Sequence, residues 1–133
     1  MNKELIVALV DDDRIYQFTT ERLLQRLNVE VRFLWFKDGE EALEYIGEHR
    51  NEISQLPDIL IVDINMPFLD GWQFLDAFLS IKNSLAKAID IYMVSSSNDE
   101  RERSRARSTE GVLDYVEKPI TKEKLAFILS QHR

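Results

Sequence analysis

The sequence contains no cysteine among its 133 residues, which excludes disulfides, thiolate chemistry and zinc sites with cysteine ligands. Its few glycines and prolines, 4 and 3 in number, form no low-complexity tract or linker. No apolar run approaches the length that crosses a bilayer, and no N-terminal segment resembles a signal peptide, so we expect a cytoplasmic protein with no membrane partner. Positive charge is also scarce. The 17 lysines and arginines against 24 acidic residues give a net charge of -7, which argues against nonspecific binding to nucleic acid.

The length and composition favour one folded domain that spans residues 1–133. A chain of this length buries a full core without disulfides, and we expect no output domain beside it. Hydrophobic residues at 44% and charged residues at 31% are typical of globular proteins, so disorder is not expected.

Apolar runs alternate with helical periodicities along the whole chain. The runs predict strands at residues 5–10, 31–36, 59–62, 89–94 and 112–116. The periodicities predict helices at residues 14–27, 71–81, 98–109 and 121–131, and a further helix that begins after Asp38 and Gly39. This alternation predicts an α/β fold: a doubly wound five-stranded parallel sheet with helices on both faces.

Two of the predicted helices differ in character. Ile15 and Phe18 belong to the apolar positions of the helix at 14–27. The helix at 98–109 is strongly charged, with Ala106 as its only apolar residue, which predicts a solvated and salt-bridged face. The alternative is a loosely packed, switchable helix whose two ridges of arginines suit an acidic partner. His49 and His132 have no partner at ligand spacing and are expected on the surface.

Two apolar strands end in carboxylates. Asp11, Asp12 and Asp13 follow the first strand, and Asp63 ends the third apolar run. Ligands of such sheets bind beyond the carboxyl ends of the strands, which is where these acids are expected. Asp13 is expected to cap the helix that follows it. A purely structural reading makes all four acids caps and turn residues, but it explains Asp63 at a strand end poorly.

Clustered carboxylates repel one another, so we expect at least one raised pKa unless a cation is bound. Mg²⁺ relieves this repulsion and prefers one or two carboxylates, waters and phosphate oxygens. We predict Asp12 and Asp63 as direct ligands, with Asp11 acting mainly through water and the backbone carbonyl of Asn65 supplying a further oxygen. Asp63 then keeps an oxygen that can attack a phosphorus atom.

Two further residues complete a candidate phosphoryl site. Ser95 ends the fourth strand, where its hydroxyl can donate to a phosphoryl oxygen. Lys118 follows the fifth strand, and its ammonium can pair with the same group. Either residue alone is weak evidence, because strand-end serines and surface lysines are common. Together with the acids they indicate phosphoryl chemistry.

The combined pattern resembles the receiver domain of two-component response regulators. The motifs that carry the resemblance are Val10-Asp11-Asp12-Asp13, Asp63-Ile64-Asn65-Met66-Pro67 with Asp70-Gly71, Ser95, and Lys118-Pro119. The resemblance covers essentially the whole chain. It implies a flavodoxin-like (βα)5 fold with strand order 2-1-3-4-5.

The resemblance also implies roles for individual residues. Asp63 would be the phosphoacceptor, Asp11 and Asp12 the magnesium acids, and Lys118 the phosphate-sensing lysine. Ser95 would be the switch hydroxyl, where the family more often has threonine, and Tyr115 the switch aromatic. The Lys118-Pro119 bond is expected to be cis.

The implied function is signalling rather than classical enzymatic catalysis. The domain would accept a phosphoryl group from a sensor histidine kinase or a histidine phosphotransfer protein. It would then switch the surface of the fourth helix, fifth strand and fifth helix for an unknown downstream protein. We expect a monomer, with dimerisation possible after phosphorylation.

Three alternative interpretations fit the sequence less well. A haloacid-dehalogenase-like phosphatase needs a second aspartate where this chain has Asn65. A flavodoxin needs a phosphate loop rich in serine, threonine and glycine, where this chain has Asp11-Asp12-Asp13-Arg14. A degenerate receiver that only binds proteins is disfavoured by the full set of acids, hydroxyl and lysine.

Overall fold

A central parallel sheet organises the computed structural model, which describes residues 4–132. Within that range its five strands lie in the order β2-β1-β3-β4-β5. Their bounds are β1 (Leu5–Val10), β2 (Val31–Phe36), β3 (Ile59–Asp63), β4 (Asp90–Ser95) and β5 (Val112–Glu117). Every pairing is parallel. The predicted fold class and strand order are therefore confirmed.

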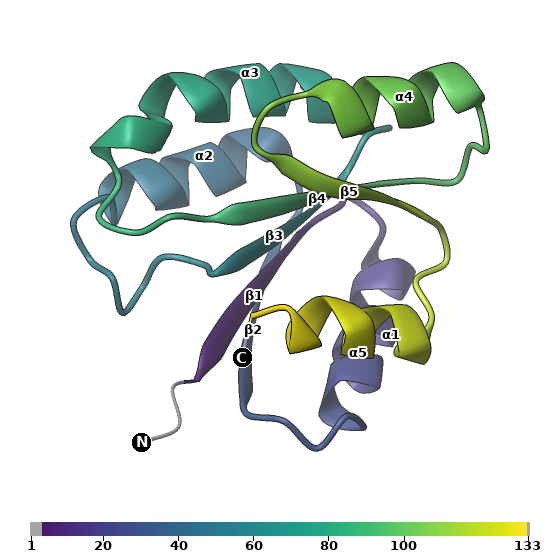
Figure 1. The fold of residues 1–133 in the computed structure, drawn as a ribbon. Helices are drawn as coiled ribbons and strands as arrows, with labels where there is room; N and C mark the ends of the chain where they lie inside the picture. Colours follow the sequence, from purple (N-terminus) through teal and green to yellow (C-terminus); the bar gives the residue numbers. More distant parts are fainter. Residues whose placement is uncertain (1–3, 133) are drawn as a thin grey trace.

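Helices cover both faces of this sheet (Figure 1). The helices are α1 (Arg14–Gln25), α2 (Gly39–Glu48), α3 (Gly71–Ile81), α4 (Glu100–Ser108) and α5 (Lys122–Ser130), with a short 3-10 helix η1 (Lys82–Ser84). In Figure 1, α1 and α5 lie on one side of the sheet, and α2, α3 and α4 lie on the other. Among the described residues, no helix is both long and apolar enough to span a membrane.

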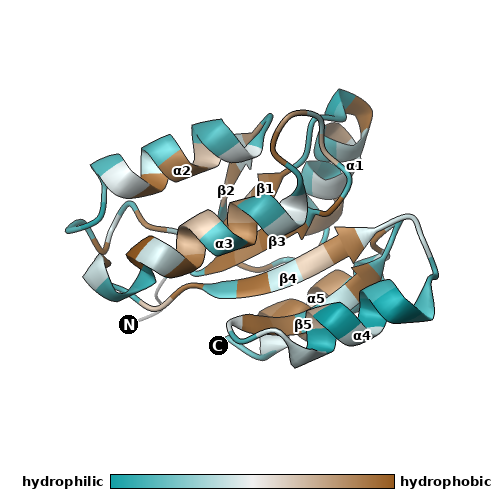
Figure 2. Ribbon diagram, turned by 90° about the horizontal axis from the view of Figure 1, so that it is seen from above, coloured by the Kyte–Doolittle hydropathy of each residue, from teal (hydrophilic) through white to brown (hydrophobic). Residues whose placement is uncertain are grey.

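The side chains of β1 alternate between two cores, as the geometry of a strand requires. Ala8 and Val10 belong to the core beneath α2, α3 and α4, which includes the fully buried Phe74. Leu5, Val7 and Leu9 belong to the core beneath α1 and α5. The strands are accordingly apolar in Figure 2, whereas α4 is almost wholly hydrophilic. Ala106 is the buried residue of α4, as its sequence predicts.

Each of the five α-helices between residues 4 and 132 follows the carboxyl end of a strand, and a side chain caps its first turn. Asp13, Asp38, Asp70, Asp99 and Thr121 accept bonds from backbone N–H groups of the first turn. The expected cap at Asp13 is confirmed, with Oδ1 2.9 Å from the nitrogen of Ile15. These caps fix the loops at the edge of the sheet where the acidic residues gather.

Three expectations from the sequence were wrong. Helix α1 ends at Gln25 rather than at residue 27, because its last bonds tighten to three-residue spacing and Asn28 turns to a positive φ of 53°. Ile15 and Phe18 do not face the core; they are 79% and 57% exposed. His132 is not a free surface residue, since Nδ1 lies 3.2 Å from Asp90 and Nε2 lies 3.1 Å from the Tyr92 hydroxyl.

Gly71 brings α3 close to the end of β3. A Cβ atom at this position would lie 2.7 Å from the Cα of Ile64 and 2.9 Å from the carbonyl oxygen of Asp63. Both atoms belong to the backbone and cannot rotate away. The hydrogen at Gly71 therefore helps to set the position of Asp63.

We expect Gly71→Ala to destabilise the fold by about 1–3 kcal/mol, because the added methyl group overpacks this contact. The matched control is Gly47→Ala in α2, where an added Cβ meets nothing within 4 Å. Alanine has the higher helix propensity, so the control should stabilise by roughly 0.5–1 kcal/mol. Urea unfolding of both variants measures the difference, and equal stabilities would contradict the close approach.

Candidate functional site

Two buried carboxylates lie side by side at the carboxyl edge of the sheet. Asp11 follows β1 and Asp63 ends β3, and these strands are hydrogen-bonded neighbours. Asp11 is fully buried and Asp63 is 4% exposed, whereas Asp12 is exposed to solvent. Oxygens from all three carboxylates lie within 4.8 Å of one another. The structure thus brings together the three acids that the sequence singled out.

Lys118 reaches both buried acids from the end of β5. Its Nζ lies 2.8 Å from Asp11 Oδ2 and 3.3 Å from Asp63 Oδ2. The nitrogen donates a hydrogen bond to Asp63, but its contact with Asp11 is an ion pair without the direction of a good hydrogen bond. The Lys118-Pro119 peptide bond is cis, as expected. One ammonium therefore faces two buried carboxylates.

The pKa values of these three groups reflect the excess of buried negative charge. Burial, followed by the charge of Asp11, raises the pKa of the Asp63 carboxyl from 3.8 to about 6, and Lys118 only partly opposes the rise. Burial also raises the pKa of Asp11. Burial alone would lower the pKa of Lys118, but its contacts with both acids outweigh burial and raise it. The repulsion predicted from the sequence is present, although burial is the larger cause.

Ser95, Asn65 and Ser97 surround the acceptor side of the site. The nitrogen of Asn65 donates to Asp63 Oδ1 at 3.1 Å, and its side-chain Nδ2 donates to the Ser95 hydroxyl at 3.2 Å. The backbone nitrogen of Ser97 donates to the same hydroxyl at 3.1 Å. Ser95 is fully buried. Its hydroxyl thus already accepts two bonds beside Asp63 and has its own hydrogen to donate.

Tyr115 connects this loop to α4. Its hydroxyl donates to the carbonyl of Ser97 at 2.6 Å and contacts Glu102 Oε1 at 2.8 Å. The guanidinium of Arg103 lies 5.5 Å from the ring centroid and pairs with Glu117 at 3.7 Å. Tyr115 as a whole is buried, with 6% exposure. The hydroxyl of Tyr115 therefore joins the Ser97 loop to the first half of α4.

Two aromatic residues contact the site although their sequence positions did not suggest it. The indole nitrogen of Trp35 donates to the Asp11 carbonyl at 2.8 Å, and the ring centroid of Tyr16 lies 4.4 Å from Lys118 Nζ. Burial and the charges of Asp11 and Asp63 raise the pKa of Tyr16, despite a bond from Ile120. In the sequence, both aromatics look like ordinary core residues, and their contacts arise only when strands and helices are assembled.

The acidic group fits a hard divalent cation. Its donors are carboxylate oxygens, the ligands that Mg²⁺ prefers, and Asp12 supplies an exposed oxygen on the solvent side. Asp11 Oδ2 is buried without a well-directed hydrogen bond, so one acceptor remains poorly satisfied. Asp11, Asp12 and Asp63 would hold the ion.

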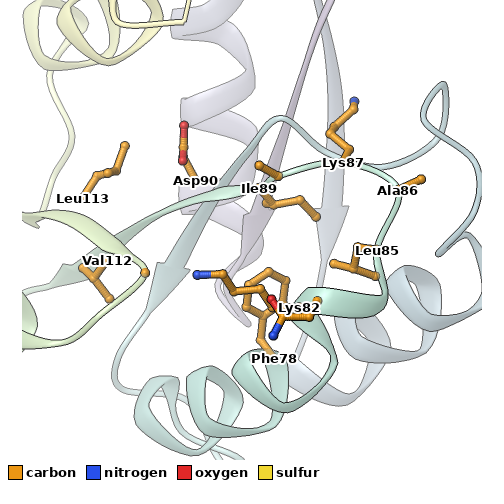
Figure 3. Close-up of a pocket in the computed structure, with 12 residues that line it drawn as sticks. Phe78, Lys82, Leu85, Ala86, Lys87, Ile89, Asp90, Val112 and Leu113 are labelled. Atoms are coloured by element: carbon orange, nitrogen blue, oxygen red, sulfur yellow. The ribbon is translucent and has the colours of Figure 1, made fainter.

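A hollow of about 390 Å³ lies away from these residues, at the amino ends of β4 and β5 (Figure 3). Its lining mixes apolar side chains such as Phe78 and Val112 with Lys87 and Asp90. Lys87 is already paired with Asp58, and Asp90 with His132. It contains none of the residues predicted for phosphoryl chemistry, and we assign it no part in that chemistry.

Comparison with known proteins identifies the family of this chain. The family model described as the response regulator receiver domain matches residues 7–130, which is nearly the whole chain. The matched range includes Asp11, Asp63 and Lys118.

Individual relatives agree with this match. Protein PilG of Pseudomonas aeruginosa is 32% identical over 128 residues, covering 96% of this chain and 87% of its own length. The probable methanogenesis regulatory protein FilR2 of Methanothrix harundinacea is 31% identical over 121 residues, covering 90% of this chain and 76% of its own length. A two component response regulator from Cytophaga hutchinsonii has a similar structure, with a TM-score of 0.83, 27% identity and coverage of 98% and 97% of the two chains.

The raised pKa of Asp63 predicts how pH changes the stability of the metal-free protein. The folded state holds this proton more tightly than the unfolded chain, so the free energy of unfolding falls as the pH rises from 3.8 to about 6. Asp63→Asn removes this loss. The variant should be more stable than the parent near neutral pH by up to about 3 kcal/mol, and the gain should disappear below about pH 4.

Urea unfolding in the presence of a chelator, at two pH values, measures this gain. Asp76→Asn, an exposed position in α3, is the matched control and should change stability little at either pH. A parent that is more stable than Asp63→Asn at neutral pH would contradict the electrostatic description.

Proposed function

The chain belongs to the family of response regulator receiver domains, and from this premise we propose that Asp63 accepts a phosphoryl group from a phosphohistidine. The donor would be a sensor histidine kinase or a histidine phosphotransfer protein. The observation that carries the proposal is the buried Asp63 carboxylate, with Lys118 Nζ 3.3 Å away and Asp11 beside it. A buried acid with this surrounding charge is better suited to accept a group than to stabilise a core.

In the proposed reaction, an oxygen of Asp63 attacks phosphorus while the bond from phosphorus to the histidine nitrogen breaks. Lys118 already contacts Asp63 and would pair with a phosphoryl oxygen, while the Ser95 hydroxyl would donate to another. Asn65 holds Asp63 Oδ1 through its backbone nitrogen and thereby orients the carboxylate. These groups would stabilise the charge of the transferred phosphoryl group.

We propose Mg²⁺ as the ion held by Asp11, Asp12 and Asp63, with the backbone carbonyl of Asn65 as a further ligand. When bound, the ion would neutralise charge on the acids and on the phosphoryl oxygens. Asp12 is the exposed member of the group, so it would meet the ion from the solvent side.

The proposed output is a shift in the packing of α4, β5 and α5. If Ser95 turns toward a phosphoryl group, the bonds it accepts from Asn65 and Ser97 must rearrange. The carbonyl of Ser97 accepts from the Tyr115 hydroxyl, which also contacts Glu102 of α4. Because Ala106 is the buried residue of α4, few apolar contacts oppose a movement of this helix. The downstream partner would read that movement.

Intact mass after incubation with acetyl phosphate and Mg²⁺ tests the acceptor. The parent should gain one phosphoryl group, whereas Asp63→Asn should gain none and Lys118→Gln should gain it more slowly. A chelator should abolish the gain. Modification of Asp63→Asn to the same extent as the parent would exclude Asp63 as the acceptor. A parent that neither gains mass nor binds beryllofluoride, a mimic of the acyl phosphate, would favour a domain that only binds proteins.

Hydrogen exchange tests the proposed output. Tyr115→Phe removes the hydroxyl that donates to Ser97 and contacts Glu102, so the amides of α4 should exchange about three- to tenfold faster, a loss of roughly 1 kcal/mol. Tyr45→Phe, whose hydroxyl bonds Gln55 instead, is the matched control and should leave α4 unchanged. Equal protection of α4 in the parent and in Tyr115→Phe would remove Tyr115 from the proposed connection.

A further inference from the structure

The ammonium of Lys118 lies at the end of a flexible four-carbon stem, so contacts with other groups must keep it in place. It is 18% exposed, and its Nζ lies between Asp11 at 2.8 Å and Asp63 at 3.3 Å. These two ion pairs attract the ammonium but do not by themselves fix the rotamers of the stem. Some other group must limit the positions that the stem can take, because lysine has no rigid fork of donors.

The ring of Tyr16 supplies that limit. Its centroid lies 4.4 Å from Nζ, within the range of a cation–π interaction. The ring packs against the core beneath α1 and α5, and its hydroxyl accepts a bond from the nitrogen of Ile120 at 3.4 Å. The tyrosine is therefore fixed from α1 on one side and from the segment after Lys118 on the other.

We propose that Tyr16 is a positioning residue for phosphoryl transfer, which holds the Lys118 ammonium over Asp63 through the face of its ring. The ring face attracts the ammonium electrostatically and limits where Nζ can lie. Nζ therefore stays close to Asp11 and Asp63, where it can also meet an incoming phosphoryl oxygen. The inference rests on the proposed function of Asp63.

In this positioning role, the aromatic ring of Tyr16 is essential and its hydroxyl contributes little. Tyr16→Phe keeps the ring and should phosphorylate within about twofold of the parent rate. Tyr16→Leu keeps an apolar side chain without the ring and should be about three- to tenfold slower with acetyl phosphate and saturating Mg²⁺. Phe18→Leu, the same kind of change at an exposed position of α1, is the matched control and should not alter the rate.

A double-mutant cycle separates positioning from general damage to the fold. In a Lys118→Gln background there is no ammonium to position, so Tyr16→Leu should change the remaining rate by less than twofold. The inference is overturned if Tyr16→Leu slows both backgrounds equally, if it does not slow the parent, or if Tyr16→Phe is as slow as Tyr16→Leu. Thermal unfolding of each variant verifies that it is folded under the assay conditions.

A second measurement does not depend on phosphorylation. The ring should shift the NMR signals of the Lys118 ε-methylene protons upfield in the parent and in Tyr16→Phe, and the shift should be lost in Tyr16→Leu. An unshifted signal in the parent would overturn the inference even if the protein is phosphorylated. A shifted signal in a parent that neither gains a phosphoryl group nor binds beryllofluoride would instead refute the proposed function, and the positioning role with it.

Discussion

The site depends on a charge imbalance: two buried carboxylates share one ammonium. Asp11 and Asp63 are nearly inaccessible to water, and Lys118 is the cation that contacts both. A core designed only for stability would replace such a group with apolar side chains, because burying an excess of like charge is costly. Under the proposed function, this excess of buried negative charge would favour a bound cation and the charge redistribution that phosphoryl transfer brings.

Strand ends and backbone contacts position the two acids and Lys118. Strands β1 and β3 carry the acids, β4 carries Ser95 and β5 leads to Lys118, so four neighbouring strands contribute to one edge. The close approach of Gly71 fixes the backbone at Asp63, and the indole of Trp35 holds the carbonyl of Asp11. From this edge, Ser97 and Tyr115 extend the connection to α4, which is the helix with the least apolar anchoring. Asp63 and α4 are thus linked by a short chain of hydrogen bonds.

Much of this arrangement could be predicted from the sequence because it depends on strand ends. Parallel strands bring their carboxyl ends to one edge, so apolar runs that end in Asp63 and Ser95 already imply that these side chains meet. The contacts of Tyr16 and Trp35 could not be predicted, because an aromatic residue in a helix or strand has the same pattern whether it packs in the core or touches a site. The outward Ile15 and Phe18 of α1 show the same limit, since helical spacing does not say which apolar positions find a partner. The pairing of His132 with Asp90 and Tyr92 joins residues that lie far apart in the sequence.

The crystal structure of the protein with Mg²⁺ and beryllofluoride tests the central claim most directly, because beryllofluoride attaches to the oxygen that would receive the phosphoryl group. The account predicts beryllium bonded to Asp63, a metal ion in contact with the Asp11, Asp12 and Asp63 group, and Lys118 and Ser95 turned toward the fluorine atoms. Beryllofluoride bonded to another residue, or a metal ion bound away from these acids, would contradict it.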